Sequence, residues 1–247
     1  MSKQAEQAFL SVIGEEGRQH SLLKPFSDPS CGVLLSSIGA IMALLPPAPA
    51  KILDLGCGGA WTSVFYALRG YIVTGQDIAP DMIDLAIENR ARHGLTDEQL
   101  TFICGDFEAI AGSADYDCAI FFDSLHHAED EALAIRSAFD ALKPGGILIT
   151  HEPGEGHSTN PHSIAAMEAF GVNERDMPPS LIIKRGIEAG FRGYRVLPMP
   201  ADLIQVFYER TYPEGWLSNR GFVVMRRLFR MLFAPRKTIS SIVLLTK

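Results

Sequence analysis

KILDLGCGGAWTS, residues Lys51 to Ser63, is the stretch around which the rest of this chain can be understood. It starts as an apolar, β-prone run, breaks into glycines at positions 56, 58 and 59, and resumes with a helical pattern. Glycine permits a tight turn and lets a ligand approach the main chain closely. The first N–H groups of the helix then point at whatever lies above the strand. The stretch therefore predicts a nucleotide-type site at a strand–turn–helix junction.

Two kinds of ligand fit such a junction, and the spacing of the glycines separates them. A dinucleotide fingerprint needs G-x-G-x-x-G, but counting from Gly56 places Trp61 where the last glycine should be. What remains is Asp-x-Gly-x-Gly-x-small, written here as Asp54, Gly56, Gly58 and Ala60. This pattern resembles the first motif of the class I S-adenosylmethionine (SAM) methyltransferases. Ala60 replaces the usual third glycine and is expected to add one methyl group beside the ligand's tail.

Composition narrows the class of protein. With 247 residues, of which 47% are hydrophobic, the chain can bury a core, and one domain with an elaboration is the expected size. The net charge of -7 argues against a nucleic-acid partner, because phosphate binding needs a basic surface. The N-terminus is polar and no apolar run reaches spanning length, so we expect neither a signal peptide nor a transmembrane helix, and a cytoplasmic location.

Strands and helices alternate from Lys51 onward, as in a parallel sheet. The expected strands are Lys51–Leu55, Tyr71–Gln76, Leu100–Cys104, Asp117–Phe122, Ile147–His151, Phe191–Leu197 and Ser240–Leu245. The expected helices between them are Trp61–Arg69, Pro80–His93, Glu129–Leu142 and Ser180–Ala189. Two earlier helices, within residues 1–20 and over Val33–Leu45, divide the chain into an N-terminal helical cap (1–50) and a larger domain (51–247). The resemblance implies that the cap acts as a lid; plain packing helices are the alternative.

Acidic residues follow several strands, at the edge where ligands bind in an open parallel sheet. Asp77 ends the second strand and is placed to accept both hydroxyls of a ribose, because a carboxylate is acceptor-only. Asp106 is the expected acceptor for an adenine amino group, with Phe107, Ile78 and Met82 as apolar neighbours. Each acid taken singly is equally consistent with a helix N-cap.

Taken together, Asp54, the glycines, Asp77, Asp106 and the Leu-Lys-Pro-Gly-Gly run at 142–146 follow the order of the whole methyltransferase signature over residues 51–152. The resemblance implies a Rossmann-like, doubly wound α/β fold with a mostly parallel seven-stranded sheet and an antiparallel last strand. It implies SAM as cofactor and S-adenosylhomocysteine as product. The implied cofactor-binding residues are Asp54, Gly56, Cys57, Gly58, Gly59, Ala60, Asp77, Ile78, Met82, Gly105, Asp106, Phe107 and Asp123.

The expected chemistry lies after the fourth strand, in FFDSLHHAED. Methyl transfer is an in-line displacement from an activated donor, so the protein mainly aligns the acceptor and manages its proton. His126 and His127 are the candidate bases, because imidazole titrates near neutral pH. The Asp123-x-x-x-His127 spacing resembles that of small-molecule methyltransferases that use a histidine here, which favours His127. A histidine packed against the sheet is the alternative.

The loop HEPGEGHSTNPH, which follows the fifth strand, is polar and rich in glycine. We expect Glu152 and His157 to contact the acceptor. Imidazole and carboxylate are also zinc-type ligands, but their spacing here matches no metal motif, so no metal site is predicted.

Residues 200–237 form an insertion too long for a hairpin turn. Arg226, Arg227 and Arg230 share one narrow face of a helix that is otherwise apolar over residues 222–233. Such a helix packs on the protein or on a second copy in a homodimer, or it contacts an anionic lipid surface. Tyr208 and Trp216 are expected to line an acceptor pocket beneath it.

The sequence thus predicts a SAM-dependent methyltransferase acting on a hydroxyl, or an amine, of a small molecule such as a sugar or natural product. Two alternatives remain open. One is a SAM-binding partner subunit without catalysis, and the other is a SAM-using enzyme that modifies lipid.

Overall fold

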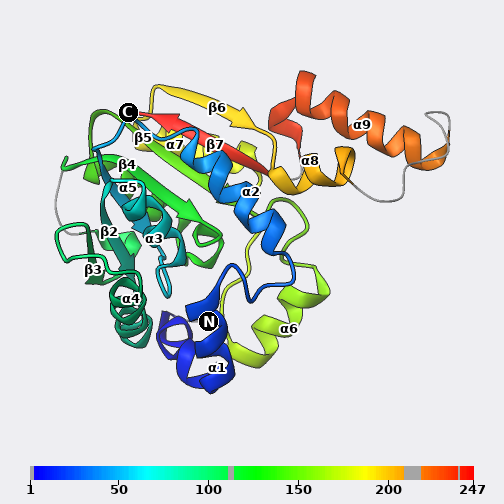
Figure 1. Cartoon of the computed structure of the whole chain (residues 1–247). Coiled ribbons are helices and arrows are strands. Elements are labelled where there is room, and N and C mark those ends of the chain that lie inside the picture. The colour runs from blue at the N-terminus through cyan, green and yellow to red at the C-terminus, as the bar shows by residue number, and fades with distance from the viewer. Residues whose placement is uncertain (1–2, 111–113, 209–217, 239) are drawn as a thin grey trace.

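The computed structural model describes residues 3–110, 114–208, 218–238 and 240–247. A seven-stranded sheet in the order β3-β2-β1-β4-β5-β7-β6 forms its centre (Figure 1). The strands are β1 (Lys51–Leu55), β2 (Ile72–Asp77), β3 (Leu100–Cys104), β4 (Tyr116–Phe122), β5 (Leu142–Glu152), β6 (Gly193–Leu197) and β7 (Ser241–Thr246). β1 to β5 pair in parallel, whereas β7 runs antiparallel between β5 and β6. The predicted fold class is confirmed, including the antiparallel last strand.

Helices surround the sheet and link its strands. They are α1 (Lys3–Leu23), α2 (Cys31–Met42), α3 (Trp61–Leu68), α4 (Pro80–Arg92), α5 (Glu131–Ala141), α6 (Pro161–Phe170), α7 (Pro179–Ala189), α8 (Pro200–Phe207) and α9 (Asn219–Phe233). Short 3-10 turns occur at η1 (Phe107–Ala109), η2 (Leu125–His127) and η3 (Pro235–Lys237). α1 is kinked at Gly14, whose φ of 64° interrupts the helix.

Successive side chains of a strand point to opposite faces of the sheet, so the apolar residues of the buried strands form a hydrophobic core on each face. In β4, Ala119 and Phe121 pack on one side with α5 and α7. Cys118, Ile120 and Phe122 pack on the other side with α2 and α3. Because both faces are covered, these central strands are apolar throughout, as parallel strands in such folds are. A buried sheet of this kind fixes the carboxyl ends of β1, β2 and β4 relative to one another.

The expected elements agree with the structure to within a few residues, with two differences. β5 begins at Leu142 rather than Ile147, because the Pro-Gly-Gly segment already extends along the sheet after α5. The polar loop after β5 contains a helix, α6, which the sequence did not reveal. Asn160 caps that helix by accepting a hydrogen bond from the N–H of His162, and Pro161 occupies its first turn.

The insertion between β6 and β7 forms α8 and α9, which extend beyond the edge of the sheet (Figure 1). Phe222, Phe229, Leu232 and Phe233 of α9 are each more than 60% exposed. The apolar face of this helix is therefore largely uncovered by the described part of its own chain. Within that described part, no helix combines the length and apolar content needed to cross a membrane.

Candidate functional site

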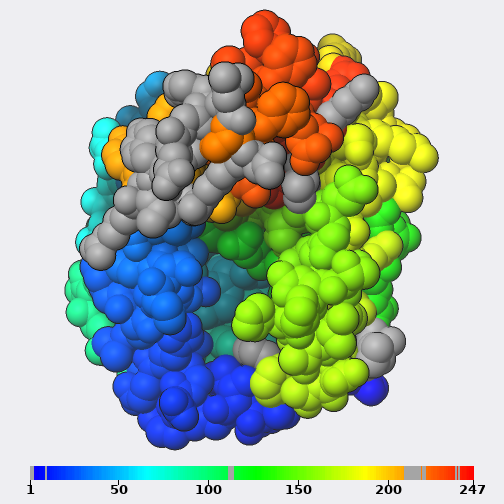
Figure 2. Space-filling view, turned by 90° about the vertical axis from the view of Figure 1, so that its right-hand side faces the viewer, coloured from blue at the N-terminus to red at the C-terminus, as the bar shows by residue number. Residues whose placement is uncertain are grey.

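A cavity of about 790 Å³ lies over the carboxyl ends of β1, β2 and β4. Its walls come from α1, the β1–α3 turn, the ends of β2 and β4, η1, α6 and the segment that follows α6. Figure 2 shows its mouth as a hollow framed by the N-terminal helices and α6. This volume is ample for a nucleotide-sized cofactor and a small second ligand.

The glycine turn forms one wall of the cavity. Gly56 and Gly58 have φ values of 71° and 51°, which favour glycine. A Cβ atom on Gly56 would meet the Cβ of Ser124 at 2.5 Å, so the turn and the end of β4 can approach only because this residue is glycine. Gly56, Cys57, Gly58 and Gly59 all line the cavity, as predicted for the cofactor-binding turn.

Asp54 and Ala60 lie behind that wall and do not line the cavity. The Asp54 carboxylate is buried and accepts hydrogen bonds from Thr62 Oγ1 at 2.7 Å and Ser63 Oγ at 2.6 Å. Burial raises its pKa to about 6, against the lowering effect of these two hydroxyls. Asp54 therefore ties the start of α3 to the end of β1. The sequence predicted that the methyl group of Ala60 lies beside the ligand's tail. Ala60 is instead buried, with a left-handed φ of 63°, and its methyl group does not reach the cavity.

Asp77 lies at the end of β2 and lines the cavity. Its two carboxylate oxygens accept hydrogen bonds from the N–H groups of Gly58 at 2.8 Å and Ala79 at 2.9 Å. Burial raises its pKa, and these two backbone donors oppose that effect. Each oxygen keeps a further acceptor position, so Asp77 both caps the local backbone and can accept from a diol.

Asp106 combines capping with a position at the cavity wall in the same way. One oxygen accepts from the N–H of Glu108 at 2.8 Å, and the other pairs with Lys3 Nζ of α1 at 2.5 Å. Ile78, Met82 and Phe107 also line the cavity. Gly105 does not; its N–H bonds to the carbonyl of Asp77 at 2.8 Å.

Asp123 lines the cavity at the end of β4 with a left-handed φ of 49°. Its carboxylate accepts from Nδ1 of the buried His151 at 3.1 Å, and the His151 ring stacks on Phe122 with centroids 4.3 Å apart. Burial alone would raise the pKa of Asp123, but the charge and hydrogen bond of His151 lower it overall. Asp123 is therefore held as an anion beside the centre of the cavity.

Glu152 was predicted to contact the acceptor, but it does not line the cavity. Its side chain is fully buried, and one oxygen accepts from the N–H groups of Ser124 and Leu125 at 3.0 and 2.9 Å. The other oxygen accepts from the N–H of His126 at 3.2 Å and from its Nδ1 at 2.7 Å. Glu152 thus holds the turn after β4 in place, and it does so with every strong acceptor position in use.

The two adjacent histidines differ in their environment. His126 is buried against Glu152 and does not line the cavity. His127 lines the cavity, and its Nδ1 lies 2.7 Å from the carbonyl of Asn173 and 3.4 Å from Oε1 of Glu6. Burial would lower the pKa of His127, but the hydrogen bond and charge of Glu6, with Glu174, outweigh it and raise the pKa to about 9.

The chain matches known proteins in both sequence and structure. Residues 52–146 match the model of a methyltransferase domain. The ubiquinone biosynthesis O-methyltransferase of Xanthomonas axonopodis is 33% identical over 197 residues, covering 79% of this chain and 71% of that protein. The SAM-dependent Diels-Alderase iccD of Talaromyces variabilis is 34% identical over 102 residues, which is 40% of this chain and 35% of that enzyme. Among solved structures, phosphoethanolamine N-methyltransferase 2 of Haemonchus contortus in complex with SAM shares the fold, with a TM-score of 0.65, 17% identity, and coverage of 100% of this chain and 59% of that one.

The chain belongs to the class I SAM-dependent methyltransferases. SAM is its cofactor, and it is an enzyme of methyl transfer. The cavity at the carboxyl edge of the sheet lies where the ligand of an open parallel sheet is expected.

Two further predicted residues do not line the cavity of this methyltransferase, and a third is not described by the structure. His157 does not line the cavity; its Nε2 is 2.5 Å from Oε2 of Glu174. Tyr208 is 78% exposed beyond α8 and does not line the cavity either. Trp216 lies outside the described residues.

The sequence missed several cavity residues of the methyltransferase. Glu174 lines the cavity from the segment between α6 and α7, and Lys3, Glu6 and Glu16 line it from α1. Helical periodicity indicated α1, but it could not show which face the helix turns toward the cavity. Nothing around Glu174 has the form of a motif, so only its position in space identifies it.

Proposed function

We propose that this enzyme transfers the methyl group of SAM to a hydroxyl of a small molecule. The observation that carries the proposal is the position of His127 in the wall of the same cavity that Asp123 and the glycine turn line. The name of the Xanthomonas relative, an O-methyltransferase of ubiquinone biosynthesis, supports a hydroxyl acceptor. The net charge of -7 and the cavity of about 790 Å³ both favour a small molecule over a nucleic acid.

His127 is suited to receive the proton of that hydroxyl. The carbonyl of Asn173 can only accept, so Nδ1 of His127 donates to it. In the neutral ring this leaves the lone pair on Nε2 free. A raised pKa makes the ring a stronger proton acceptor, although only its unprotonated fraction can act. The oxygen then attacks the methyl carbon as the carbon–sulfur bond breaks, and the electron pair of that bond remains on sulfur.

The other end of the cavity is assigned to the cofactor. The proposal places the ribose hydroxyls on Asp77 and the adenine among Ile78, Met82 and Phe107, with Asp106 at its amino group. α1 then acts as a lid. At the start of this helix, Lys3 contacts Asp106 and Glu6 contacts His127. Opening α1 would break these contacts and expose the cavity.

A labelled-methyl assay with a panel of phenols, catechols, sugars and amines tests the proposal. We expect transfer to hydroxyl compounds, and we expect His127→Gln to lower kcat by about 10² to 10⁴ while the affinity for SAM stays within twofold. The matched control is His93→Gln, an exposed histidine remote from the cavity. Transfer to amines alone would contradict the hydroxyl assignment. Tight SAM binding without any transfer would favour a function like that named for iccD, a SAM-dependent Diels-Alderase.

We also propose that α9 contacts an anionic lipid surface. Its exposed side chains combine aromatic and aliphatic groups with Arg226 and Arg230, which is typical of interfacial helices. A homodimer interface is the competing explanation for the same face. Such a contact would bring the enzyme to an apolar acceptor at the lipid surface.

A further inference from the structure

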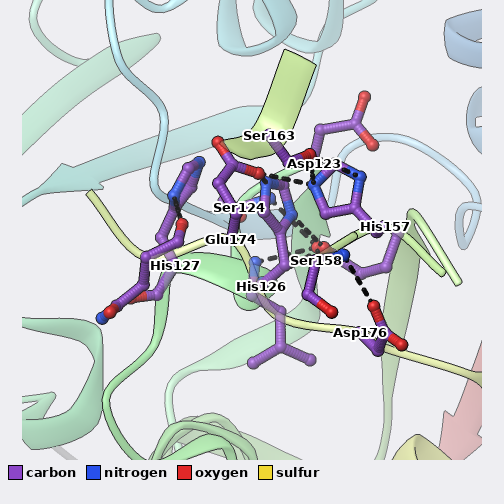
Figure 3. Close-up of polar contacts among 12 residues, drawn as sticks. Asp123, Ser124, His126, His127, His157, Ser158, Ser163, Glu174 and Asp176 are labelled. Atoms are coloured by element: carbon purple, nitrogen blue, oxygen red, sulfur yellow. Dashed lines mark hydrogen bonds and ion pairs between the residues drawn. The ribbon is translucent and has the colours of Figure 1, made fainter. Parts of the chain in front are cut away.

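The acceptor end of the cavity contains a compact cluster of potential metal ligands. Figure 3 shows the carboxylate of Glu174 among the rings of His126, His127 and His157. One ligand atom from each of His126, His127 and Glu174 lies within 4.8 Å of the other two. In the part of the chain that the structure describes, no other trio of histidine, cysteine or acidic side chains meets so closely.

We propose that His126, His127 and Glu174 bind a divalent first-row transition-metal ion. Two imidazoles and one carboxylate suit zinc, iron(II), manganese or cobalt, whereas magnesium and calcium prefer a set of oxygen ligands. Ligand atoms about 2.1 Å from such an ion lie roughly 3 to 3.5 Å apart. Nε2 of His126 and Oε2 of Glu174 are 3.7 Å apart, so this pair needs only a small side-chain rotation.

Neighbouring polar groups hydrogen-bond to all three ligand side chains and orient the atoms that would bind the ion. His126 donates from Nδ1 to Glu152 at 2.7 Å, which leaves Nε2 directed at Glu174. His127 donates from Nδ1 to the carbonyl of Asn173 at 2.7 Å, which leaves its own Nε2 as the ligand atom. His157 contacts the Glu174 carboxylate at 2.5 Å and fixes its orientation. Partners that hold the second ring nitrogen or the carboxylate in this way are typical of metal sites.

The site opens toward the acceptor. His127 and Glu174 line the cavity, so coordination positions not filled by the protein are open to it. If the proposed hydroxyl acceptor is correct, its oxygen binds the ion there, and the ion lowers the pKa of the hydroxyl. In the metal-bound enzyme Nε2 of His127 is a ligand and no longer the base, so the ion takes over the role that His127 has without it: the hydroxyl proton leaves to solvent, and the oxygen attacks the methyl carbon as the carbon–sulfur bond breaks. This role rests on the proposed function, whereas the binding site itself does not.

Titration of the untagged, full-length protein with Co²⁺ tests the site. We expect one ion per chain, seen as a visible absorption band of cobalt with nitrogen and oxygen ligands, and displacement of cobalt by Zn²⁺ in calorimetry. Glu174→Gln and His127→Gln, which keep size and hydrogen bonding, should each weaken cobalt binding at least 100-fold. His157→Gln acts through Glu174 and should weaken it 10- to 100-fold. The matched control His162→Gln changes an exposed histidine of α6 and should leave affinity within twofold.

The affinity for SAM, measured on the same samples, reports whether each variant is folded. Absence of one-to-one binding to the wild-type protein would overturn the site. Binding that survives both Glu174→Gln and His127→Gln in folded protein would overturn it equally. Because no acceptor is needed, a wild-type enzyme that methylates a hydroxyl but binds no cobalt rejects the metal site alone and leaves the proposed function standing.

Discussion

The two ends of the cavity are built in different ways. At the cofactor end, residues 54–63 and 76–79 belong to one strand–turn–helix unit and the strand beside it, and the side chains of Asp54 and Asp77 accept hydrogen bonds from within these two segments. At the acceptor end, His126 and His127 depend on Glu152, Glu174 and Glu6, which lie 26 to 121 positions away in the chain. The cofactor end is therefore a local structure that a short motif can specify. The acceptor end is assembled from distant segments, which leaves room for different acceptors on one fold.

The largest effect on the cofactor end is expected from replacing Asp77, which should weaken SAM binding. In Asp77→Ala the site loses a half-buried carboxylate that two backbone N–H groups hold in place and that we assign to the ribose. Two charge-assisted hydrogen bonds to the cofactor correspond to about 3 to 6 kcal/mol, so calorimetry should show at least 100-fold weaker SAM binding. Asp84→Ala, an exposed position of α4, is the matched control and should bind SAM normally. An affinity for SAM unchanged by Asp77→Ala would reject the ribose assignment.

The difference between a local cofactor end and an acceptor end built from distant segments explains which site residues could be predicted from the sequence. The glycine turn, Asp77 and Asp106 were placed at the cavity from their order along the chain, because strand ends of a parallel sheet share one edge. The alternative interpretation of these acids as helix N-caps is confirmed for Asp106, which caps η1 by accepting from the N–H of Glu108. It is wrong for Asp77, which accepts from the N–H of Ala79 although Ala79 itself is the N-cap of α4. Capping and a position in the cavity wall are compatible, because one carboxylate has acceptor positions for both.

Prediction failed where a side chain could turn either way. Glu152 ends β5 beside the cavity, yet it points inward because the turn after β4 presents three N–H groups that need an acceptor. His157 was expected at the acceptor, but it precedes α6 and contacts Glu174, which lines the cavity in its place. Glu6 and Asn173 are 167 positions apart and in contact, and no spacing rule anticipates such a pair. Packing between distant segments decides these positions.

Asp54 offers a smaller effect, which should appear as pH dependence of stability. Its pKa is raised to about 6 in the folded protein from an ordinary value of 3.8. The folded state therefore binds the proton more tightly, and the contribution of Asp54 to stability is complete below about pH 4 and lost as pH rises through 6. The difference corresponds to about 3 kcal/mol.

Urea unfolding of the wild type and Asp54→Asn from pH 4 to 7.5 measures this contribution, because other titrating groups cancel in the difference between the two proteins. The free energy of unfolding of the wild type should fall relative to the variant between pH 4 and 6, then stay level. Parallel curves would show that the Thr62 and Ser63 hydroxyls fully offset burial. The hydrogen bonds of Thr62 and Ser63 to the Asp54 carboxylate would then be stronger than the raised pKa implies.

The smallest effect concerns α9, which extends the comparison to a surface outside the cavity, beyond the edge of the sheet (Figure 1). Replacing both Arg226 and Arg230 by Ala should weaken binding to vesicles that contain anionic phosphatidylserine by about 1 kcal/mol per arginine, measured by co-sedimentation. The pair Arg69→Ala and Arg92→Ala removes the same charge from exposed positions elsewhere and should bind as wild type. An equal loss in both double variants would indicate only a net-charge effect.

No vesicle binding, together with a dimer in light scattering that Phe229→Ser and Phe233→Ser abolish, would show that a second copy covers this face. Because these phenylalanines are exposed, their replacement should cost the monomer little stability, so either outcome can be assigned to the surface of α9 rather than to unfolding.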